Sequence, residues 1–277
     1  MKIVNHKLVA EGSEIIVHTR KSPNFNDYQT SDGKPKDLII HYTAAGLSST
    51  LNTFETAGGT SAHLVIDRNG DIYQMVPLSK RAFHAGYSSW DGLIAFNNRS
   101  IGIELINFGF DVAKANGASD TVTIKHKHKF IPQTQWQKYP QPQMDALIKV
   151  TKALLVSYSL QKILGHDDIS AGRKQDPGPA FPWDEYRIAL FGSSSNIGKI
   201  FKTTTEGVNL RKSDSSTSDS LKKLTLGYEV GLIETWNNWS RVYLCQNASE
   251  VVFKDSRGKQ QNKKIMGWIR SDLLTLK

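Results

Sequence analysis

The most informative stretch of this chain is Gly165-His-Asp-Asp-Ile-Ser-Ala-Gly-Arg-Lys-Gln-Asp-Pro-Gly-Pro179. It brings His166, Lys174 and Asp176 together on one segment rich in glycine and proline, while another histidine, His41, follows an apolar run far upstream. Two neutral imidazoles and one carboxylate suit a zinc ion, and three protein ligands leave the fourth position of a tetrahedral site open for water. The pattern therefore indicates a hydrolytic metal centre.

Each of these residues also has an ordinary structural explanation. Taken alone, His41 at a strand end is better explained as a hydrogen-bonded core histidine. His166 and Asp176 are equally compatible with turn contacts, as is common for an aspartate before Pro-Gly. The joint pattern, with Lys174 between the two loop residues, is what favours a metal centre over coincidence.

A glutamate within an apolar strand strengthens this interpretation. Glu104 lies in Ser100-Ile-Gly-Ile-Glu-Leu-Ile-Asn107, flanked by aliphatic residues. A carboxylate there is costly unless it has a partner or faces a cleft, and desolvation raises its pKa. We interpret Glu104 as a general base, and a structural ion pair with a nearby Lys or Arg is the alternative.

The region upstream of residue 190 shows alternating strand and helix patterns. Continuous apolar runs at Leu38–Ile40 and Ile101–Ile106 predict buried strands, and an Asn-Gly turn within Leu64–Val76 predicts a hairpin. A helix is predicted where apolar residues recur every three or four positions after Pro142, namely at Met144, Leu147, Val150, Leu154 and Tyr158. Strands interleaved with helices indicate an α/β domain with a central mixed sheet flanked by helices.

The chain of 277 residues is long enough for two domains. Small polar residues from Gly192 to Asn196, followed by three threonines, predict a linker. We place the domains at 1–190 and 205–277, with the linker at 191–204. Short β-rich runs downstream predict a small antiparallel barrel; they are Val230–Glu234, Trp239–Leu244, Val251–Phe253 and Met266–Ile269.

Composition and charge limit the classes of protein to consider. The net charge is +9, of which residues 195–277 contribute +6 and residues 1–194 contribute +3. Such an excess favours polyanions such as nucleic acid or an anionic cell-wall polymer, although a solubilising surface explains the charge alone equally well. The single cysteine, Cys245, excludes an intrachain disulfide. No run has membrane-spanning length, and the N-terminal residues lack a signal peptide's apolar stretch.

A second histidine tract lies at Lys125-His-Lys-His-Lys129. Its lysines repel a cation and it offers no carboxylate ligand. We therefore predict a solvated basic loop there and not a metal site.

At this point the motifs resemble those of the type 2 N-acetylmuramoyl-L-alanine amidases, relatives of the peptidoglycan recognition proteins. The likeness spans residues 20–185, and its last motif, Gly165-His…Lys174-Gln-Asp-Pro-Gly-Pro179, is highly specific. The other motifs are Ser22-Pro-Asn-Phe25, Ile40-His-Tyr-Thr43, Ser61-Ala-His-Leu-Val-Ile66, Phe83-His-Ala-Gly86 and Ile101-Gly-Ile-Glu104.

The resemblance implies a role for each residue that matches a family motif. It implies that His41, His166 and Asp176 bind Zn²⁺, that Glu104 is the catalytic base, and that Lys174 stabilises the developing oxyanion. Phage relatives carry a tyrosine where this chain has Ala62, so the chain is similar to the branch that uses a strand glutamate instead.

The resemblance also implies that three further side chains line the substrate cleft. These are Phe83, His84 and Trp90, and His84 is nearly as well explained as a structural histidine. The implied substrate is a muramyl peptide of peptidoglycan.

Residues 205–275 resemble a bacterial Src-homology-3-like domain, a frequent wall-targeting attachment. The likeness rests on Glu206-Gly-Val-Asn-Leu-Arg211, Leu224-Thr-Leu-Gly-Tyr-Glu-Val230, Trp239-Ser-Arg-Val-Tyr243 and Gly267-Trp-Ile-Arg270. The polar stretch Lys254–Lys264 is expected to elongate a loop. This domain would bind the cell wall, with anionic wall polymers as further partners, and Trp239 or Trp268 would belong to its core.

Two other function classes remain as alternatives. A non-catalytic peptidoglycan recognition protein would share the fold but need not keep the metal ligands, Glu104 and Lys174. A nucleic-acid-binding protein would explain the charge but not the buried glutamate. We expect a monomer that is made in the cytoplasm and acts at the cell envelope after release or injection. Such a protein would be a phage lysin or an antibacterial effector. A cytosolic recycling amidase is the interpretation that we rank last.

Overall fold

The chain forms two compact units in the computed structural model, Met1–Tyr186 and Arg187–Lys277. The structure describes residues 1–90, 92–111, 118–127, 133–158, 160–191, 199–236, 238–245, 249–254 and 260–277. The predicted linker core, residues 192–196, lies outside the described residues. Within the range predicted as linker, α4 (Trp183–Phe191) ends and β15 (Ile200–Thr203) begins.

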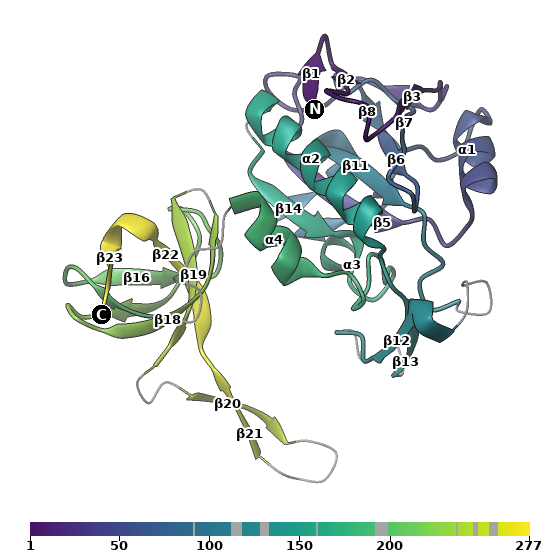
Figure 1. Ribbon diagram of the computed structural model, residues 1–277. Helices are drawn as coiled ribbons and strands as arrows, with labels where there is room; N and C mark the ends of the chain where they lie inside the picture. Colours follow the sequence, from purple (N-terminus) through teal and green to yellow (C-terminus); the bar gives the residue numbers. More distant parts are fainter. Residues whose placement is uncertain are drawn as a thin grey trace. The chain divides into compact units, whose positions relative to one another are not determined.

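The first unit is built on a six-stranded mixed sheet with the strand order β14-β5-β11-β6-β7-β3 (Figure 1). The pairs β14–β5, β5–β11, β11–β6 and β7–β3 are parallel, and the hairpin β6–β7 is antiparallel, as its Asn-Gly turn predicted. In sheet order the strands are Lys162–Gly165, Asp37–Tyr42, Ser100–Leu105, Leu64–Ile66, Ile72–Gln74 and Val17–Thr19. The predicted mixed α/β architecture is therefore confirmed for this unit.

Helices cover both faces of this sheet. α2 (Gln141–Ser157) runs across one face (Figure 1), where the Gln143 amide donates to the carbonyl oxygens of Ile66 and Ile106. Its predicted apolar stripe is buried. On the other face, α1 (Leu47–Glu55) packs through Leu51 and Phe54 against Val65. The sheet is thus a buried middle layer, and its polar side chains need partners within the protein.

Short elements surround the sheet. They are the hairpins β1 (Lys2–Val4) with β2 (Lys7–Val9), β9 (Ser89–Trp90) with β10 (Leu93–Ile94) and β12 (Thr121–Ile124) with β13 (Thr134–Gln137); the pair β4 (Phe25–Asn26) with β8 (Arg81–Ala82); α3 (His166–Ile169); and the 3-10 turns Phe96–Asn98 and Ala118–Asp120.

The second unit is an antiparallel β structure with its own core. Its seven-stranded sheet has the order β17-β16-β22-β19-β18-β15-β23, and a separate hairpin joins β20 to β21. The bounds not yet given are β16 (Val208–Arg211), β17 (Ser220–Leu224), β18 (Glu229–Trp236), β19 (Trp239–Leu244), β20 (Ser249–Lys254), β21 (Gln260–Lys264), β22 (Met266–Arg270), β23 (Leu274–Leu276) and the 3-10 turn Ser271–Leu273. All four β-rich runs predicted here are strands.

One expectation for this unit is wrong at residues 260–264. The polar stretch Lys254–Lys264 was expected to elongate a loop, yet Gln260–Lys264 is a strand that pairs with Ser249–Lys254, while residues 255–259 lie outside the described residues. Strand pairing supplies backbone hydrogen bonds whatever the side chains are, so a polar sequence can still form a ladder.

No helix among the described residues is long and apolar enough to cross a membrane.

One glycine of the central sheet is required by close packing. A Cβ atom on Gly102 would lie 2.4 Å from Cγ of His84, because the imidazole lies flat on the strand at this point. We expect Gly102→Ala to displace His84 and lower the free energy of unfolding by about 1–3 kcal/mol. Urea denaturation measures the change. The control is Gly59→Ala, where the nearest atom is 3.6 Å away, and equal stability of the two variants would contradict the packing argument.

Candidate metal centre

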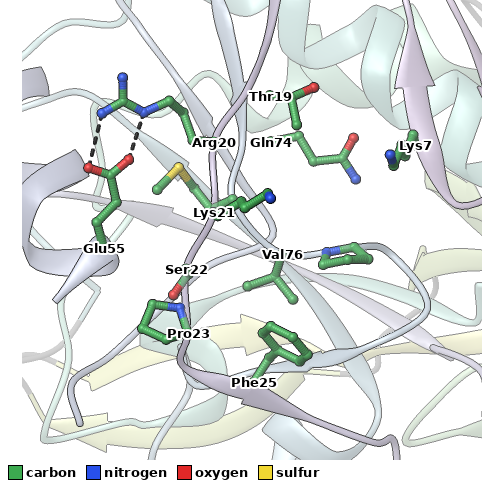
Figure 2. Close-up of a pocket in the computed structure, with 12 residues that line it drawn as sticks. Lys7, Thr19, Arg20, Lys21, Ser22, Pro23, Phe25, Glu55, Gln74 and Val76 are labelled. Carbon is green, nitrogen blue, oxygen red and sulfur yellow. Dashed lines mark hydrogen bonds and ion pairs between the residues drawn. The ribbon is translucent and has the colours of Figure 1, made fainter. Parts of the chain in front are cut away.

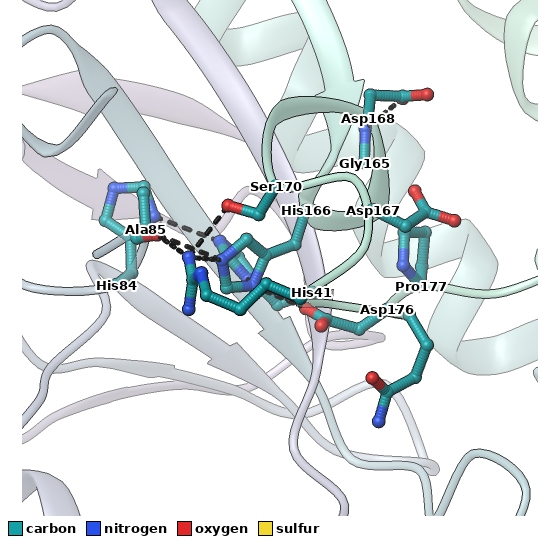
Figure 3. A network of polar contacts seen from close by, with 12 residues as sticks. His41, His84, Ala85, Gly165, His166, Asp167, Asp168, Ser170, Asp176 and Pro177 are labelled. Atoms are coloured by element: carbon teal, nitrogen blue, oxygen red, sulfur yellow. Dashed lines mark hydrogen bonds and ion pairs between the residues drawn. The ribbon is translucent and has the colours of Figure 1, made fainter. Parts of the chain in front are cut away.

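Three predicted ligands from distant parts of the chain meet at one point (Figure 3). His41 lies near the end of β5, His166 begins α3, and Asp176 lies in the loop after α3. The Nδ1 atoms of the two histidines are 2.9 Å apart, and each lies 3.0 Å from Oδ2 of Asp176. All three residues are buried, and theirs is the one group of potential metal ligands found among the described residues.

The partners of His41 determine which of its nitrogens carries the proton. The Ser100 carbonyl oxygen can only accept a hydrogen bond, and it lies 3.3 Å from Nε2 of His84, so that nitrogen of His84 is the donor. In a neutral ring, Nδ1 of His84 must then accept, and it lies 3.0 Å from Nε2 of His41. The Nδ1 atom of His41 is left without a proton and faces His166 and Asp176.

His166 is oriented in the same way. Its Nε2 lies 3.1 Å from the carbonyl oxygen of Ala85, which can only accept, so Nε2 carries the proton. In the neutral ring Nδ1 of His166 carries no proton, and it points at Nδ1 of His41. Metal-binding histidines usually donate their second ring nitrogen to a carbonyl or carboxylate in this way.

The result is a triangle of acceptor atoms with no proton to share. Burial and the neighbouring His166 lower the pKa of His41 to about 4, so its ring is neutral at pH 7. Donors around a tetrahedral ion with bonds of about 2.0–2.1 Å are about 3.3 Å apart, so the observed spacing and chemistry fit a divalent transition-metal ion.

Glu104 and Lys174 lie beside this triangle. Glu104 on β11 is the register partner of His41 on β5, so the two side chains share a face of the sheet. Burial and the charge of Asp176 raise the pKa of Glu104 to about 8, while the Lys174 ammonium opposes the shift. Oε2 of Glu104 is buried and has no hydrogen-bond partner in the part of the chain that the structure describes. The two candidate catalytic groups and the three candidate ligands thus occupy one site.

The residues predicted to line the substrate cleft differ in their positions. Both ring nitrogens of His84 face protein groups, as the structural alternative expects. Phe83 is half-buried below the Arg81 guanidinium, whose carbon lies 5.4 Å from the ring centre. Trp90 is 38% exposed on the β9–β10 hairpin, close in sequence to the exposed Tyr87. Substrate contacts by Phe83 and Trp90 stay predictions.

Arg173 is a site residue to which the sequence assigned no role. Its Nη2 donates to the carbonyl oxygens of Ala85 and Tyr87 and to Oγ of Ser170, each at 2.7 Å. It thereby ties the metal-ligand loop to the segment that orients His166. The sequence feature that could have indicated a role for Arg173 is its position directly before Lys174 in the motif that spans residues 165–179.

The basic tract at Lys125–Lys129 is partly described, and the prediction of a solvated loop is wrong for His126. This ring is buried, stacks on Trp136 at a centroid distance of 5.5 Å, and lies 3.2 Å from the Asp167 carboxylate. Burial beneath an aromatic ring was not visible in the local pattern of charges. His128 and Lys129 lie outside the described residues.

A separate cavity was not foreseen. It has a volume of about 590 Å³, and the apolar residues Met75 and Val76 are part of its lining. Figure 2 shows Val76 among the side chains that line it. An ion pair between Arg20 and Glu55 closes one side, with Nε of the arginine 2.6 Å from the carboxylate. None of the candidate ligands or catalytic residues lines this cavity.

Comparison with protein families gives one match. The family described as N-acetylmuramoyl-L-alanine amidase matches residues 31–179, which hold all three candidate ligands together with Glu104 and Lys174.

Individual relatives agree with this match. The chain is 36% identical to N-acetylmuramoyl-L-alanine amidase AmiD of Escherichia coli (strain K12) over 159 residues, 54% of this chain and 51% of AmiD. It is 38% identical to 1,6-anhydro-N-acetylmuramyl-L-alanine amidase AmpD of the same strain over 132 residues, 47% of this chain and 58% of AmpD. The chain thus spans about half the length of these relatives.

A solved structure shows the same fold. A crystal structure of a selenomethionine derivative of AmpD superposes with a TM-score of 0.52 and 29% sequence identity, covering 69% of this chain and 99% of that chain.

The raised pKa of Glu104 predicts how stability depends on pH. In metal-free protein the folded state binds this proton up to about pH 8, whereas the unfolded chain, with the ordinary value of 4.5, releases it earlier. Stability is therefore fully present at low pH and falls as the pH rises toward 8, since the unfolded state binds fewer protons.

We expect chelator-treated wild-type protein to lose on the order of 4 kcal/mol from this source between about pH 5 and about pH 9, and Glu104→Gln to lose none of it. Chemical denaturation at both pH values measures the difference, and Glu185→Gln on α4 is an exposed control. Parallel pH profiles for wild type and Glu104→Gln would show that burial does not hold the Glu104 proton.

Proposed function

The chain belongs to the N-acetylmuramoyl-L-alanine amidase family, and on that premise we propose that it hydrolyses the amide between N-acetylmuramic acid and the L-alanine of peptidoglycan with the help of bound zinc. One observation carries the proposal: three buried, unprotonated donor atoms 2.9–3.0 Å apart, with Glu104 on the adjacent strand. Two nitrogens and one oxygen form the donor set of hydrolytic zinc sites.

The zinc ion would supply Lewis acidity, lowering the pKa of a water molecule and polarising the scissile carbonyl. Glu104 would accept the proton of the attacking water and return it to the leaving amine. The charge of bound zinc would lower the Glu104 pKa from about 8 toward neutrality, where one carboxyl can both accept and return a proton. Its Oε2 has no hydrogen-bond partner among the described residues and would be open to the attacking water. The Lys174 ammonium would stabilise negative charge on the substrate oxygen.

The names of the relatives support this substrate class without choosing within it. AmiD is named for an amide of N-acetylmuramic acid, and AmpD for the 1,6-anhydro form of that sugar. The runner-up function, a non-catalytic peptidoglycan recognition protein, would need neither a neutral His41 oriented by His84 nor a buried Glu104 beside the candidate ligands. Both features favour catalysis.

We also propose that the second unit is an Src-homology-3-like module that directs the enzyme to the cell wall. Its support is the antiparallel sheet with its own apolar core, together with the +6 charge of residues 195–277. Positive charge would raise the local concentration of enzyme on an anionic sacculus, and a second binding site would add avidity.

Two substitutions separate metal binding from proton transfer. We expect Glu104→Ala to keep zinc but lose about 10²–10⁴-fold in turnover, because only the proton acceptor is removed. We expect His166→Ala to lose both zinc and activity. Elemental analysis measures the metal, and mass spectrometry of digested sacculi measures released stem peptides that begin with L-alanine. Glu185→Ala is the control.

Equal metal loss in Glu104→Ala and His166→Ala would contradict the role of Glu104. Cut glycan strands or cut peptide cross-links, or products unchanged by a chelator, would contradict the proposed reaction itself.

The role of the second unit can be tested by removing residues 195–277. The first unit has its own core, so we expect hydrolysis of a small muramyl peptide to be retained while co-sedimentation with purified sacculi weakens by tenfold or more, as avidity is lost. The co-sedimentation is measured at low and high salt. Unchanged sedimentation of the shortened chain would refute wall targeting by this unit.

A further inference from the structure

The basic tract at Lys125–Lys127 is not explained by the proposed reaction. It follows β12, and the paired strand β13 carries Trp136. The His126 side chain is 1% exposed and lies against the Trp136 indole with an interplanar angle of 26°. The same indole packs on Gly178, where a Cβ atom would lie 2.7 Å from the ring. The hairpin β12–β13 therefore packs directly against the loop that carries two of the candidate metal ligands.

His126 contacts both arms of that loop. Its Nε2 lies 3.2 Å from Oδ2 of Asp167, the residue directly after His166. The same nitrogen lies 3.1 Å from the carbonyl oxygen of Gln175, the residue directly before Asp176. Both partners are acceptors, so Nε2 carries the proton and is shared between them. One imidazole N–H thus joins the two chain segments next to the ligands.

Asp167 connects this contact to the ligands themselves. Its backbone N–H donates to the carbonyl oxygen of Asp176 at 2.7 Å. Its carboxylate points away from the triangle of His41, His166 and Asp176 (Figure 3), toward the side where His126 lies. The side chain of Asp167 is 3% exposed, so its charge needs a partner.

Lys127 supplies that charge. Its Nζ lies 2.9 Å from Oδ1 of Asp167 and 2.5 Å from Oδ1 of Asp168. Asp168 in turn accepts a hydrogen bond from the backbone N–H of Gly165 at 2.7 Å, at the start of α3. His126 and Lys127 together fix the beginning and the end of the loop.

We propose that His126 and Lys127 are positioning residues that hold His166 and Asp176 at metal-binding spacing and so raise the affinity for a divalent transition-metal ion. The inference rests on the proposed metal site and goes beyond it, because neither residue touches the ion or the substrate. Without this clamp, metal binding would have to order the loop, and that entropy cost would lower the affinity. Partners that orient metal ligands are typically worth 10–100-fold in metal affinity.

The test uses two amide substitutions of His126, whose side-chain nitrogens reach the positions of different imidazole nitrogens. The side-chain nitrogen of His126→Gln reaches the position of Nε2, whereas that of His126→Asn reaches only the position of Nδ1. Zinc affinity of the full chain is measured by competition with a chromophoric chelator. We expect His126→Asn to lose about 10–100-fold and His126→Gln to recover most of that loss. Lys127→Met, which keeps the stem but not the charge, should also weaken binding, while exposed Lys125→Gln should not.

Thermal unfolding of the metal-free variants distinguishes positioning from general stability. Equal zinc affinity in wild type and His126→Asn would overturn the inference, as would equal losses in His126→Asn and His126→Gln. A lower unfolding temperature without a change in zinc affinity would also overturn it, because His126 would then stabilise only the fold. If wild-type protein itself binds no zinc, the proposed function fails first, and the two failures are distinct.

Discussion

The mutual repulsion of three acceptor atoms is the constraint around which the first unit is arranged. Three acceptor atoms lie within 3.0 Å of one another: Nδ1 of His41, Nδ1 of His166 and Oδ2 of Asp176. Each imidazole forms a hydrogen bond through its Nε2 atom, so the lone pair on its Nδ1 atom points toward the other two acceptors. Such an arrangement is unfavourable in a dry interior unless a cation occupies it. The surrounding contacts hold the arrangement in place, and the chemistry follows from it.

Each ligand is held by a different part of the fold. His41 is fixed by the central strand and by the His84 ring, which fits only because Gly102 has no side chain. His166 is fixed by the carbonyl oxygen of Ala85. Arg173 ties that same segment to the ligand loop. A rigid sheet and two tethered loops thus give a site whose geometry does not depend on a bound ion for its assembly.

The electrostatics of the site follow from the same burial. Low dielectric keeps His41 neutral and raises the pKa of Glu104 to about 8. A cation bound by the three ligands would lower the pKa of the neighbouring Glu104 carboxyl, and the ionised form that it favours is the one that can accept a proton.

The sequence by itself determined the main strands of the first unit and the residues of the candidate metal centre. Continuous apolar runs and the Asn-Gly turn predicted the strands β5 and β11 and the hairpin β6–β7, because strand burial and turn geometry are encoded locally. The motif around His166 and Asp176, together with His41, predicted a metal centre, because two imidazoles and one carboxylate are the ligands that zinc prefers. Glu104 predicted a base, because a carboxyl group within an apolar strand is costly unless it has a partner or faces a cleft.

Only the tertiary structure decided which residues orient the candidate metal ligands without binding the ion themselves. The roles of His84, Arg173 and His126 depend on contacts between residues far apart in the chain, and no local pattern records such contacts. The same limit explains why a lysine-rich tract looked solvated although His126 is buried beneath Trp136. Sequence specifies which chemical groups are available, whereas packing specifies which lone pair or proton each group presents to its neighbour.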